Sequence, residues 1–194
     1  MGKLKNKKEQ KRNSILKAAQ DIFLSEGYIL ANMDKIAKKA QVTKQTVYRY
    51  FPSKEALFES TLKNLGENSG DKFIDQLNKP DTKEALYGFA FNFIQAHLSS
   101  EHLATIRLII AENTKAPELI RSFFPIGPNE TDSRLDEFFK ERFQISDTEH
   151  LINMWTGMLL SLRTGVLMGL KPPKQSEVKE YAEKATTFLL KAIS

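Results

Sequence analysis

Apolar residues recur at intervals of three and four along most of this chain, the spacing that places side chains on one face of an α-helix. Ile15, Ala19 and Ile22 form the first such set, with the charged Lys17 and Asp21 between them. No segment alternates apolar and polar positions between the turn residues that a β-hairpin requires. The pattern therefore predicts an all-α fold of nine or ten helices.

Capping residues predict where the first helices begin and end. Gly27 is suited to end the first helix in a left-handed conformation, which glycine adopts without steric cost. Asn32, Thr43 and Ser53 carry side-chain oxygens that accept hydrogen bonds at helix N-termini, so we expect them to open the next three helices. The fourth helix is then expected to continue to about Leu77.

Prolines and capping boxes mark the later boundaries. The run from Asn78 to Pro80 interrupts the pattern, and Asp81 with Glu84 has the spacing of a capping box. Ser146 with Glu149 forms a second such pair. The predicted later helices, with a loop at 125–129, span 81–98, 101–113, 117–124, 132–143, 146–169 and 176 to the C-terminal end.

A tight link joins the two short helices expected between residues 32 and 51. The four residues from Gln41 to Lys44 are too few for antiparallel packing, so the second helix must cross the first steeply, as in a helix-turn-helix unit. Val42 and Val47 are the apolar positions that would hold this crossing. The second helix then presents hydroxyls, an amide, a phenol and cations, the groups that bind base edges and phosphates. These candidates are Thr43, Lys44, Gln45, Thr46, Tyr48 and Arg49.

Positive charge is concentrated at the start of the chain. Residues 1–63 hold 14 Lys and Arg against 6 Asp and Glu, whereas the remaining residues hold 15 against 18, for a formal net charge of +5. This asymmetry favours a polyanion-binding domain at 1–63 carried by a body at 64–194. Lys54 adds a cation beside a helix N-terminus, where a phosphate would bind well. Residues 1–12 form a basic arm, which is either a minor-groove or phosphate contact or a disordered tail.

Two stretches, ILKAAQDIFLSEGY (15–28) and MDKIAKKAQVTKQTVYRYFPSKEALF (33–58), resemble the TetR/AcrR family of bacterial transcriptional regulators. The resemblance implies a three-helix head that binds a palindromic DNA operator and a helical body that binds a ligand and dimerises. The segment RLIIAENTKAPELIRSFF resembles the body of one subgroup of that family, named after a quorum-related regulator.

Carried over by position, the resemblance implies a role for each residue of the head. Residues 43–46 would approach bases, and Asn32 would cap onto a phosphate. Further phosphate contacts would come from Tyr48, Tyr50 and Lys54. The chain departs from the family pattern where Gln41 and Gln45 replace frequent glycines and Tyr50 replaces a frequent histidine. Gln45 is itself a candidate to contact a base.

Aromatic residues gather in the body, which holds ten of the thirteen phenylalanines and the single tryptophan. Methionine and aromatic side chains adapt well to apolar ligands, and the resemblance implies an effector pocket here. Side chains at helical spacing can equally be ordinary filled core, so both interpretations stay open. The candidate pocket residues are Phe89, Asn92, Phe93, Phe123, Met154, Trp155, Met158 and Arg163.

Arg163 is the one charged residue in an otherwise apolar stretch between His150 and Lys171. A buried guanidinium without a partner is costly. Arg163 is therefore expected either to bind an acidic group of an effector or to pair with a carboxylate of the body, and we prefer the ion pair.

Small residues recur every four positions, at Gly157, Ser161, Gly165 and Gly169, and would let another helix approach closely. They face either another helix of the same chain or a second copy of it. We prefer a homodimer with two-fold symmetry, because a dimer is also what a palindromic DNA site needs. The predicted interface residues are Gly157, Ser161, Gly165, Tyr181, Ala185 and Phe188.

Other classes of function are poorly supported. The chain has no cysteine, its three histidines are scattered, and no catalytic or phosphate-loop motif occurs, so we expect no enzyme, no metal site and no cofactor. The head lacks the aromatic platform of single-stranded RNA modules. No apolar stretch approaches the ~20 residues of a membrane helix. We expect a cytoplasmic, homodimeric repressor that a small, largely apolar effector releases from double-stranded DNA.

Overall fold

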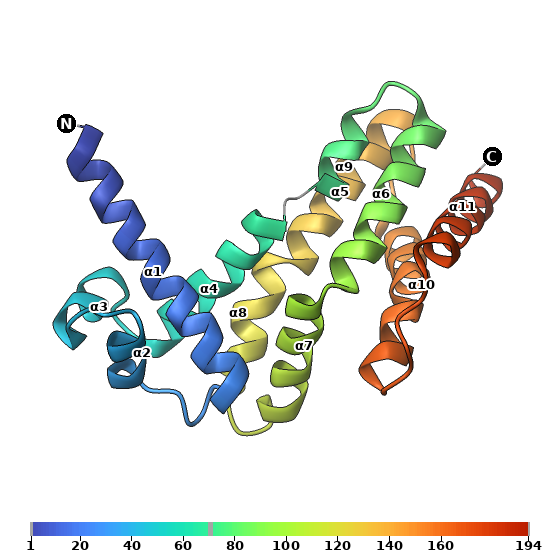
Figure 1. Ribbon diagram of the computed structural model, residues 1–194. Helices are drawn as coiled ribbons and strands as arrows, with labels where there is room; N and C mark the ends of the chain where they lie inside the picture. The colour runs from blue at the N-terminus through green and yellow to red at the C-terminus, as the bar shows by residue number, and fades with distance from the viewer. Residues whose placement is uncertain (1, 70–71, 194) are drawn as a thin grey trace. The chain divides into compact units, whose positions relative to one another are not determined.

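The computed structural model describes residues 2–69 and 72–193, with side chains from residue 6 to 65 and from residue 73 onward (Figure 1). These residues form eleven α-helices and one 3-10 helix, and none of them lies in a β-strand. The predicted all-α fold is confirmed. The expected fourth helix is divided, which adds one helix to the expected number.

The helices follow one another with short connections. They are α1 (Gly2–Glu26), α2 (Met33–Lys39), α3 (Lys44–Tyr50), α4 (Lys54–Ser69), α5 (Lys72–Asp75), the 3-10 helix η1 (Gln76–Asn78), α6 (Thr82–His97), α7 (Ser100–Glu112), α8 (Glu118–Ile126), α9 (Pro128–Phe143), α10 (Glu149–Leu167) and α11 (Gln175–Ala192).

The chain divides into two compact units. Unit 1 comprises the residues up to Asn68 together with Ala104–Ile126, and unit 2 comprises Ser69–Leu103 together with Gly127–Ser194. Packing therefore groups α8 and most of α7 with the first four helices. The functional boundary expected between residues 63 and 64 is a different kind of division, and it stays a prediction.

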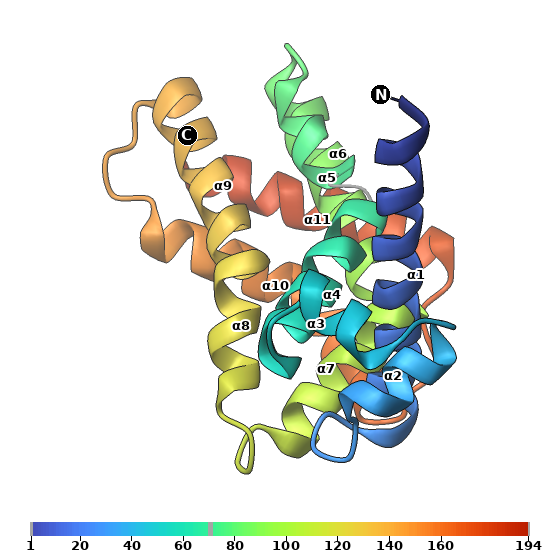
Figure 2. The same cartoon turned by 90° about the vertical axis from the view of Figure 1, so that its left-hand side faces the viewer.

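Unit 1 is built around the apolar face of α1. From Ile15 onward this face is buried, and the rings of Phe23, Tyr28 and Phe58 lie 5.2 to 5.7 Å from one another. Leu119 of α8 is buried in the same cluster. In both views α2 and α3 lie beside the lower part of α1, whose first turns extend beyond them (Figure 2).

Unit 2 is built around α6, which packs against α5, η1, α10 and α11. Phe89 is fully buried, with its ring centroid 5.4 Å from that of Trp155 and 5.3 Å from that of Phe93. Phe139 of α9 packs edge-to-face with Trp155, with ring centroids 6.2 Å apart. A core this rich in large rings buries much apolar area for its length, which is the main stabilising contribution to the unit.

Several predicted helix ends are confirmed. Gly27 has φ +85°, and the Asn32, Thr43 and Asp81 side chains accept hydrogen bonds from the backbone N–H three residues on. These ends depend on interactions within a few residues, which a sequence pattern captures directly.

Other predicted boundaries are wrong. The basic arm at 1–12 was expected to precede the first helix, but α1 already begins at Gly2. The predicted loop at 125–129 is reduced to Gly127, because α8 continues through Pro125 and Pro128 occupies the first turn of α9, where proline needs no N–H donor.

The boundaries near residues 77 and 146 also differ from the expectation. The fourth helix was expected to reach about Leu77, but α4 ends at Ser69 and α5 begins at Lys72, while residues 70 and 71 lie outside the described part. Ser146 does not cap α10. Its N-cap is Thr148, whose hydroxyl bonds instead to Asp136 of α9, a partner distant in sequence.

The turn between α1 and α2 is held by Lys54 of α4. The Lys54 ammonium donates hydrogen bonds to the carbonyl oxygens of Tyr28, Ile29 and Ala31, at 2.9, 3.3 and 3.2 Å. It also lies 4.5 Å from the centroid of the Tyr28 ring. An ammonium has three N–H donors, so these three carbonyls engage all of them.

Two glutamates of unit 1 reach the same turn. Glu112 Oε2 accepts a hydrogen bond from the backbone N–H of Ile29 at 2.9 Å. Burial, with the negative charge of Glu118 beside the phenol, raises the pKa of Tyr28 far above its ordinary value. A Cβ at Gly27 would lie 2.1 Å from Glu112 Oε1, so the turn fits closely against α7.

Replacing Lys54 with methionine should lower the free energy of unfolding by about 1.5–3 kcal/mol, because three backbone acceptors lose a charged donor. Urea unfolding measures this change. Lys63→Met on the same helix is the matched control, since Lys63 is exposed and forms a surface ion pair with Glu59, and it should cost less than about 0.5 kcal/mol. Equal stability of the two variants would contradict a structural role for Lys54.

Candidate functional sites

The helix-turn-helix unit is fixed by the turn after α2. Gln41 has φ +56°, in the left-handed region where glycine is common, and the N–H of Val42 bonds back to the carbonyl of Ala37 at 3.0 Å. Val47 of α3 is fully buried in the same cluster as Ile36 and Ala37 of α2. Val47 therefore holds α3 against α2, as expected. Gln41 stands where the family pattern frequently has a glycine, and it adopts a left-handed backbone conformation that favours glycine.

The N-terminus of α3 is ordered by its own side chains. Thr43 Oγ1 accepts the backbone N–H of Thr46 at 3.1 Å, and the two hydroxyl oxygens lie 2.9 Å apart. Both hydroxyls are therefore held in place at the end of the helix that bears a partial positive charge. Asn32 plays the same capping part for α2, accepting the N–H of Lys35 at 2.9 Å.

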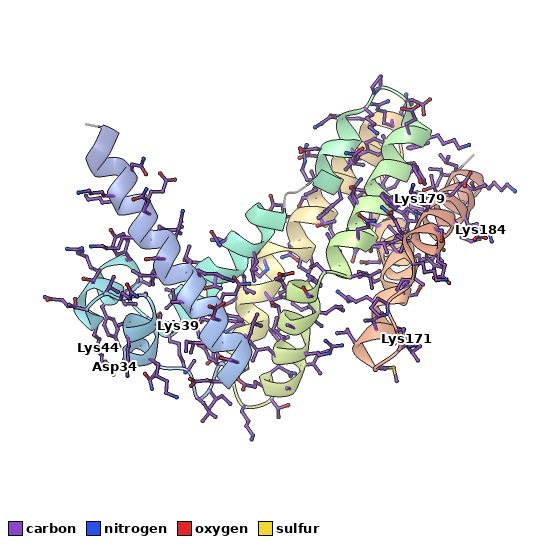
Figure 3. The ribbon with its side chains drawn as sticks, viewed as in Figure 1. Asp34, Lys39, Lys44, Lys171, Lys179 and Lys184 are labelled. Atoms are coloured by element: carbon purple, nitrogen blue, oxygen red, sulfur yellow. The ribbon has the colours of Figure 1, made fainter. Side chains whose placement is uncertain are left out.

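One face of α3 is open to solvent. Lys44 is exposed and its ammonium lies 2.8 Å from Asp34 of α2, whose hydrogen bond and negative charge raise the pKa of Lys44 (Figure 3). Arg49 is exposed and lies over the ring of Tyr50, at 5.7 Å. The remaining exposed candidates are Thr43, Gln45 and Tyr48, whereas Thr46 and Tyr50 are half-buried.

Lys54 differs from the other predicted phosphate contacts. Its ammonium is engaged by the three carbonyls of the α1–α2 turn. The structure therefore gives it a partner within the chain where a phosphate was expected. Sequence spacing could not reveal this, because the carbonyls lie more than twenty residues away.

The structure gives the candidate pocket residues of the body several different surroundings. Phe89, Phe93 and Trp155 pack ring against ring in the core of unit 2, as in the filled-core interpretation. Met154 is 67% exposed. Phe123 belongs to unit 1 and packs on that unit's core.

The other two candidates in this set have local roles. Asn92 donates its side-chain N–H to the carbonyl of Gly88 at 2.8 Å, within α6. Met158 is half-buried, and its carbonyl accepts the hydroxyl of Tyr181 at 2.9 Å. An apolar hollow was missed by the sequence analysis. It is small, about 10 Å³, which is close to the space of one water molecule, and lies in unit 1 between Phe23, Phe58 and Leu108.

Arg163 lacks the carboxylate partner that we preferred. None of the ion pairs among the described residues includes it. Its Nη1 lies 3.3 Å from Nε2 of His102, and its Nε is buried without a hydrogen-bonding partner. The expected structural ion pair is therefore wrong for the described residues, because the sequence did not reveal that an imidazole lies beside the guanidinium.

Two neutral histidines lie on one side of this guanidinium, His102 in contact with it and His97 behind His102. Burial, with the nearby positive charge of Arg163, lowers the pKa of His97 to about 4. Burial, together with His97 and Arg163, lowers the pKa of His102 to about 3. The rings of the two histidines lie 4.5 Å apart. The cluster of Arg163, His97 and His102 thus carries a single positive charge, that of Arg163. The Nε–H of Arg163 has no acceptor, and no carboxylate among the described residues neutralises the charge.

The outer sides of α10 and α11 carry most of the predicted interface residues. A Cβ at Gly157 would meet no atom within 4 Å, and Phe188 is 62% exposed. Ser161 is exposed, and its hydroxyl lies 2.8 Å from that of Tyr181. No other part of the described chain covers this face at Gly157.

Two residues of the predicted stripe, and one predicted interface residue of the last helix, have other surroundings. Ala185 is 3% exposed and belongs to the core of unit 2, because α11 turns that side toward α6. Gly165 is half-buried, with Leu170 3.0 Å from the position of a Cβ. Gly169 has φ +101° and follows the end of α10, so it terminates the helix.

Among the side chains that the structure describes, those of residues 6–65 and 73–193, no group of three His, Asp or Glu is placed to bind a metal ion. In the same residues, no helix combines the length and apolar character needed to span a lipid bilayer.

Two family models match most of the chain. Residues 15–61 match the model described as bacterial regulatory proteins of the tetR family, and residues 84–192 match the model described as the C-terminal domain of AefR-like transcriptional repressors. The chain is 30% identical over 135 residues to the HTH-type transcriptional regulator YdeS of Bacillus subtilis, covering 70% of this chain and 58% of YdeS. That match spans less than two thirds of the relative's own length.

Solved structures share the fold over nearly the whole chain. The flavonoid-responsive regulator FrrA is 30% identical, with a TM-score of 0.79 over 95% of this chain and 97% of its own. A TetR-family regulator from Mesorhizobium loti has a TM-score of 0.81 at 24% identity, over 95% of this chain and 96% of its own. The chain therefore belongs to the TetR family of helix-turn-helix transcriptional regulators.

Proposed function

We propose that this regulator acts as a homodimer that binds a palindromic DNA operator through α3 and represses transcription until a small effector releases it. The observation that carries the proposal is the solvent-facing side of α3, held outward by buried Val47 and ordered at its N-terminus by Thr43 and Thr46. The family is one of transcriptional regulators rather than enzymes. Its place of action is then the cytoplasm, where bacterial DNA lies.

Residues of α3 divide between base contact and phosphate contact. Thr43, Gln45 and Thr46 lie in the first turn, and their hydroxyl and amide groups can donate to and accept from base edges in the major groove. Lys44 and Arg49 supply cations for phosphates. The Lys44–Asp34 pair is exposed, so exchanging Asp34 for a phosphate costs little.

Dimerisation would use the outer faces of α10 and α11. Exposed Phe188 and Met154 supply apolar area, and open space at Gly157 lets a partner helix approach closely. A two-fold axis repeats α3 at the spacing of successive major grooves, about 34–36 Å or a multiple of it. This gives a palindromic site.

Effector binding would use the unpaired charge of Arg163 in unit 2. A carboxylate placed beside it would accept the unused Nε–H and neutralise a cation that burial disfavours, as the lowered pKa of Arg163 indicates. The name of FrrA describes a flavonoid-responsive protein, and its likeness supports a small organic effector. Release of DNA requires unequal effector affinity for the bound and free states.

Replacing Thr46 with valine should alter sequence preference at one base position of each half-site, because valine keeps the shape but removes the hydroxyl. Binding sites selected from random DNA with the wild-type and variant proteins measure this change, with a loss of about 5- to 150-fold on the wild-type site. Arg49→Gln is the comparison variant and should weaken binding to all sequences while lowering the salt slope. Equal losses on every DNA for both variants would refute this division of roles.

Replacing Phe188 with glutamate should convert dimer to monomer, because a charge would enter the centre of an apolar interface. Sedimentation equilibrium measures the mass, and operator affinity should fall more than about 100-fold because a monomer contacts one half-site. Lys179→Glu, about two and a half turns away and therefore on the opposite side of α11, is the control and should leave the dimer intact. A monomeric wild-type protein would contradict the dimer proposal.

Decanoate should release operator DNA at a concentration about tenfold or more below that of decanol, its uncharged match, because only the carboxylate can pair with Arg163. Arg163→Met should remove this difference, whereas Arg134→Met on the exposed side of α9 should keep it. Fluorescence anisotropy of a labelled operator gives both concentrations. If wild-type protein responds equally to the two compounds, Arg163 does not recognise an acidic group.

A further inference from the structure

The first turns of α1 carry a second cationic surface that no part of the proposed function uses. At about 100° per residue, four cations fall within about 140° of the helix circumference. They are Lys7, Lys8, Lys11 and Arg12. The same arc, continued along the helix, holds the buried Ile15, Ala19 and Ile22. One face of α1 thus changes from apolar to cationic where it leaves the core of unit 1.

This N-terminal basic face, defined by those four residues, is attached to α3. The Tyr50 hydroxyl at the end of α3 donates a long hydrogen bond, 3.4 Å, to the carbonyl of Lys8. The Arg12 guanidinium lies 5.5 Å from the ring centroid of Phe51, which caps α3 and is buried. Because all these residues belong to unit 1, the basic face has a set position beside the recognition helix (Figures 1 and 2).

The basic face is electrostatically unfavourable in the isolated chain. Lys7 with Lys11 and Lys8 with Arg12 are like-charged pairs at i, i+4, and such pairs destabilise a helix. Cations in the first turns also oppose the helix dipole. All four side chains are exposed, and none forms an ion pair with another described residue. An external polyanion would relieve each of these costs.

We propose that the N-terminal basic face is a second DNA-contact surface, which binds backbone phosphates next to the major groove that α3 occupies. The inference rests on the proposed function, since it takes the polyanion to be the DNA bound by α3. Duplex DNA is favoured over other polyanions because the face is joined to the DNA-reading helix itself. Phosphate contacts of this kind add affinity without sequence preference.

The expected effect is a change in salt dependence. Each phosphate contact adds about 0.9 to the slope of log affinity against log salt. A dimer contributes two basic faces, so removing three lysines from each protomer should lower the slope by about two to five. The selected DNA sequence should stay the same, because phosphates carry no base identity.

The test compares the triple variant K7Q/K8Q/K11Q with the matched triple variant K83Q/K171Q/K179Q, whose lysines are exposed residues of unit 2. Lys171 and Lys179 are labelled in Figure 3. Both triple variants remove the same charge, and glutamine keeps helix propensity. Operator affinity is measured by fluorescence anisotropy at several KCl concentrations, and far-UV circular dichroism checks helix content. The basic-face variant K7Q/K8Q/K11Q should bind the operator about 10- to 1000-fold more weakly at 150 mM salt, and its log affinity should depend less steeply on log salt. The control variant should match the wild type in both respects.

Each remaining outcome has a definite meaning. If the basic-face variant keeps the wild-type salt dependence while Thr46→Val still changes sequence preference, the basic face does not contact DNA but the proposed function stands. If the wild-type protein binds no DNA sequence-specifically, both fail. If the salt dependence of operator affinity falls equally in both triple variants, the effect is one of net charge and the inference is overturned. Tighter wild-type binding to phosphatidylglycerol vesicles than to duplex DNA would also overturn it.

Discussion

The steep crossing of α2 and α3 is the constraint on which all contact with DNA depends. Val47 is buried with Ile36 in one cluster, and Gln41 takes a left-handed backbone conformation that turns the chain sharply between the two helices. With that turn, the hydroxyls of Thr43 and Thr46 are held at an exposed helix N-terminus before any DNA arrives, so binding need not order them.

Lysines of unit 1 have two different roles, to stabilise the fold and to bind DNA. Lys54 is surrounded by backbone carbonyls of the α1–α2 turn, where its charge stabilises an otherwise irregular segment. Lys44 has a single exposed carboxylate partner, which a phosphate can replace. The basic face of α1 has no such partner among the described residues. The same residue type is thus structural or available for DNA according to the acceptors that the fold places near it.

Unit 2 shows how a full core and an unpaired charge can coexist. Phe89, Trp155 and Phe139 fill the space around α6, so the aromatic residues that suggested a pocket are accounted for by packing. Arg163 lies beside neutral imidazoles, with a buried Nε–H that no described group accepts. Such an unsatisfied charge is expensive for the folded chain, and the proposal of an acidic effector rests on it.

The sequence by itself determined the helical fold, the helix-turn-helix unit and the caps at Gly27, Asn32, Thr43 and Asp81. These features depend on hydrophobic period and on hydrogen bonds spanning a few residues, so local spacing is sufficient to predict them. Only the tertiary structure decided which carbonyls Lys54 binds, that a histidine lies beside Arg163, and that the basic residues at the start of the chain form a helix joined to α3. Each of these depends on groups that are distant along the chain and meet only when the helices pack.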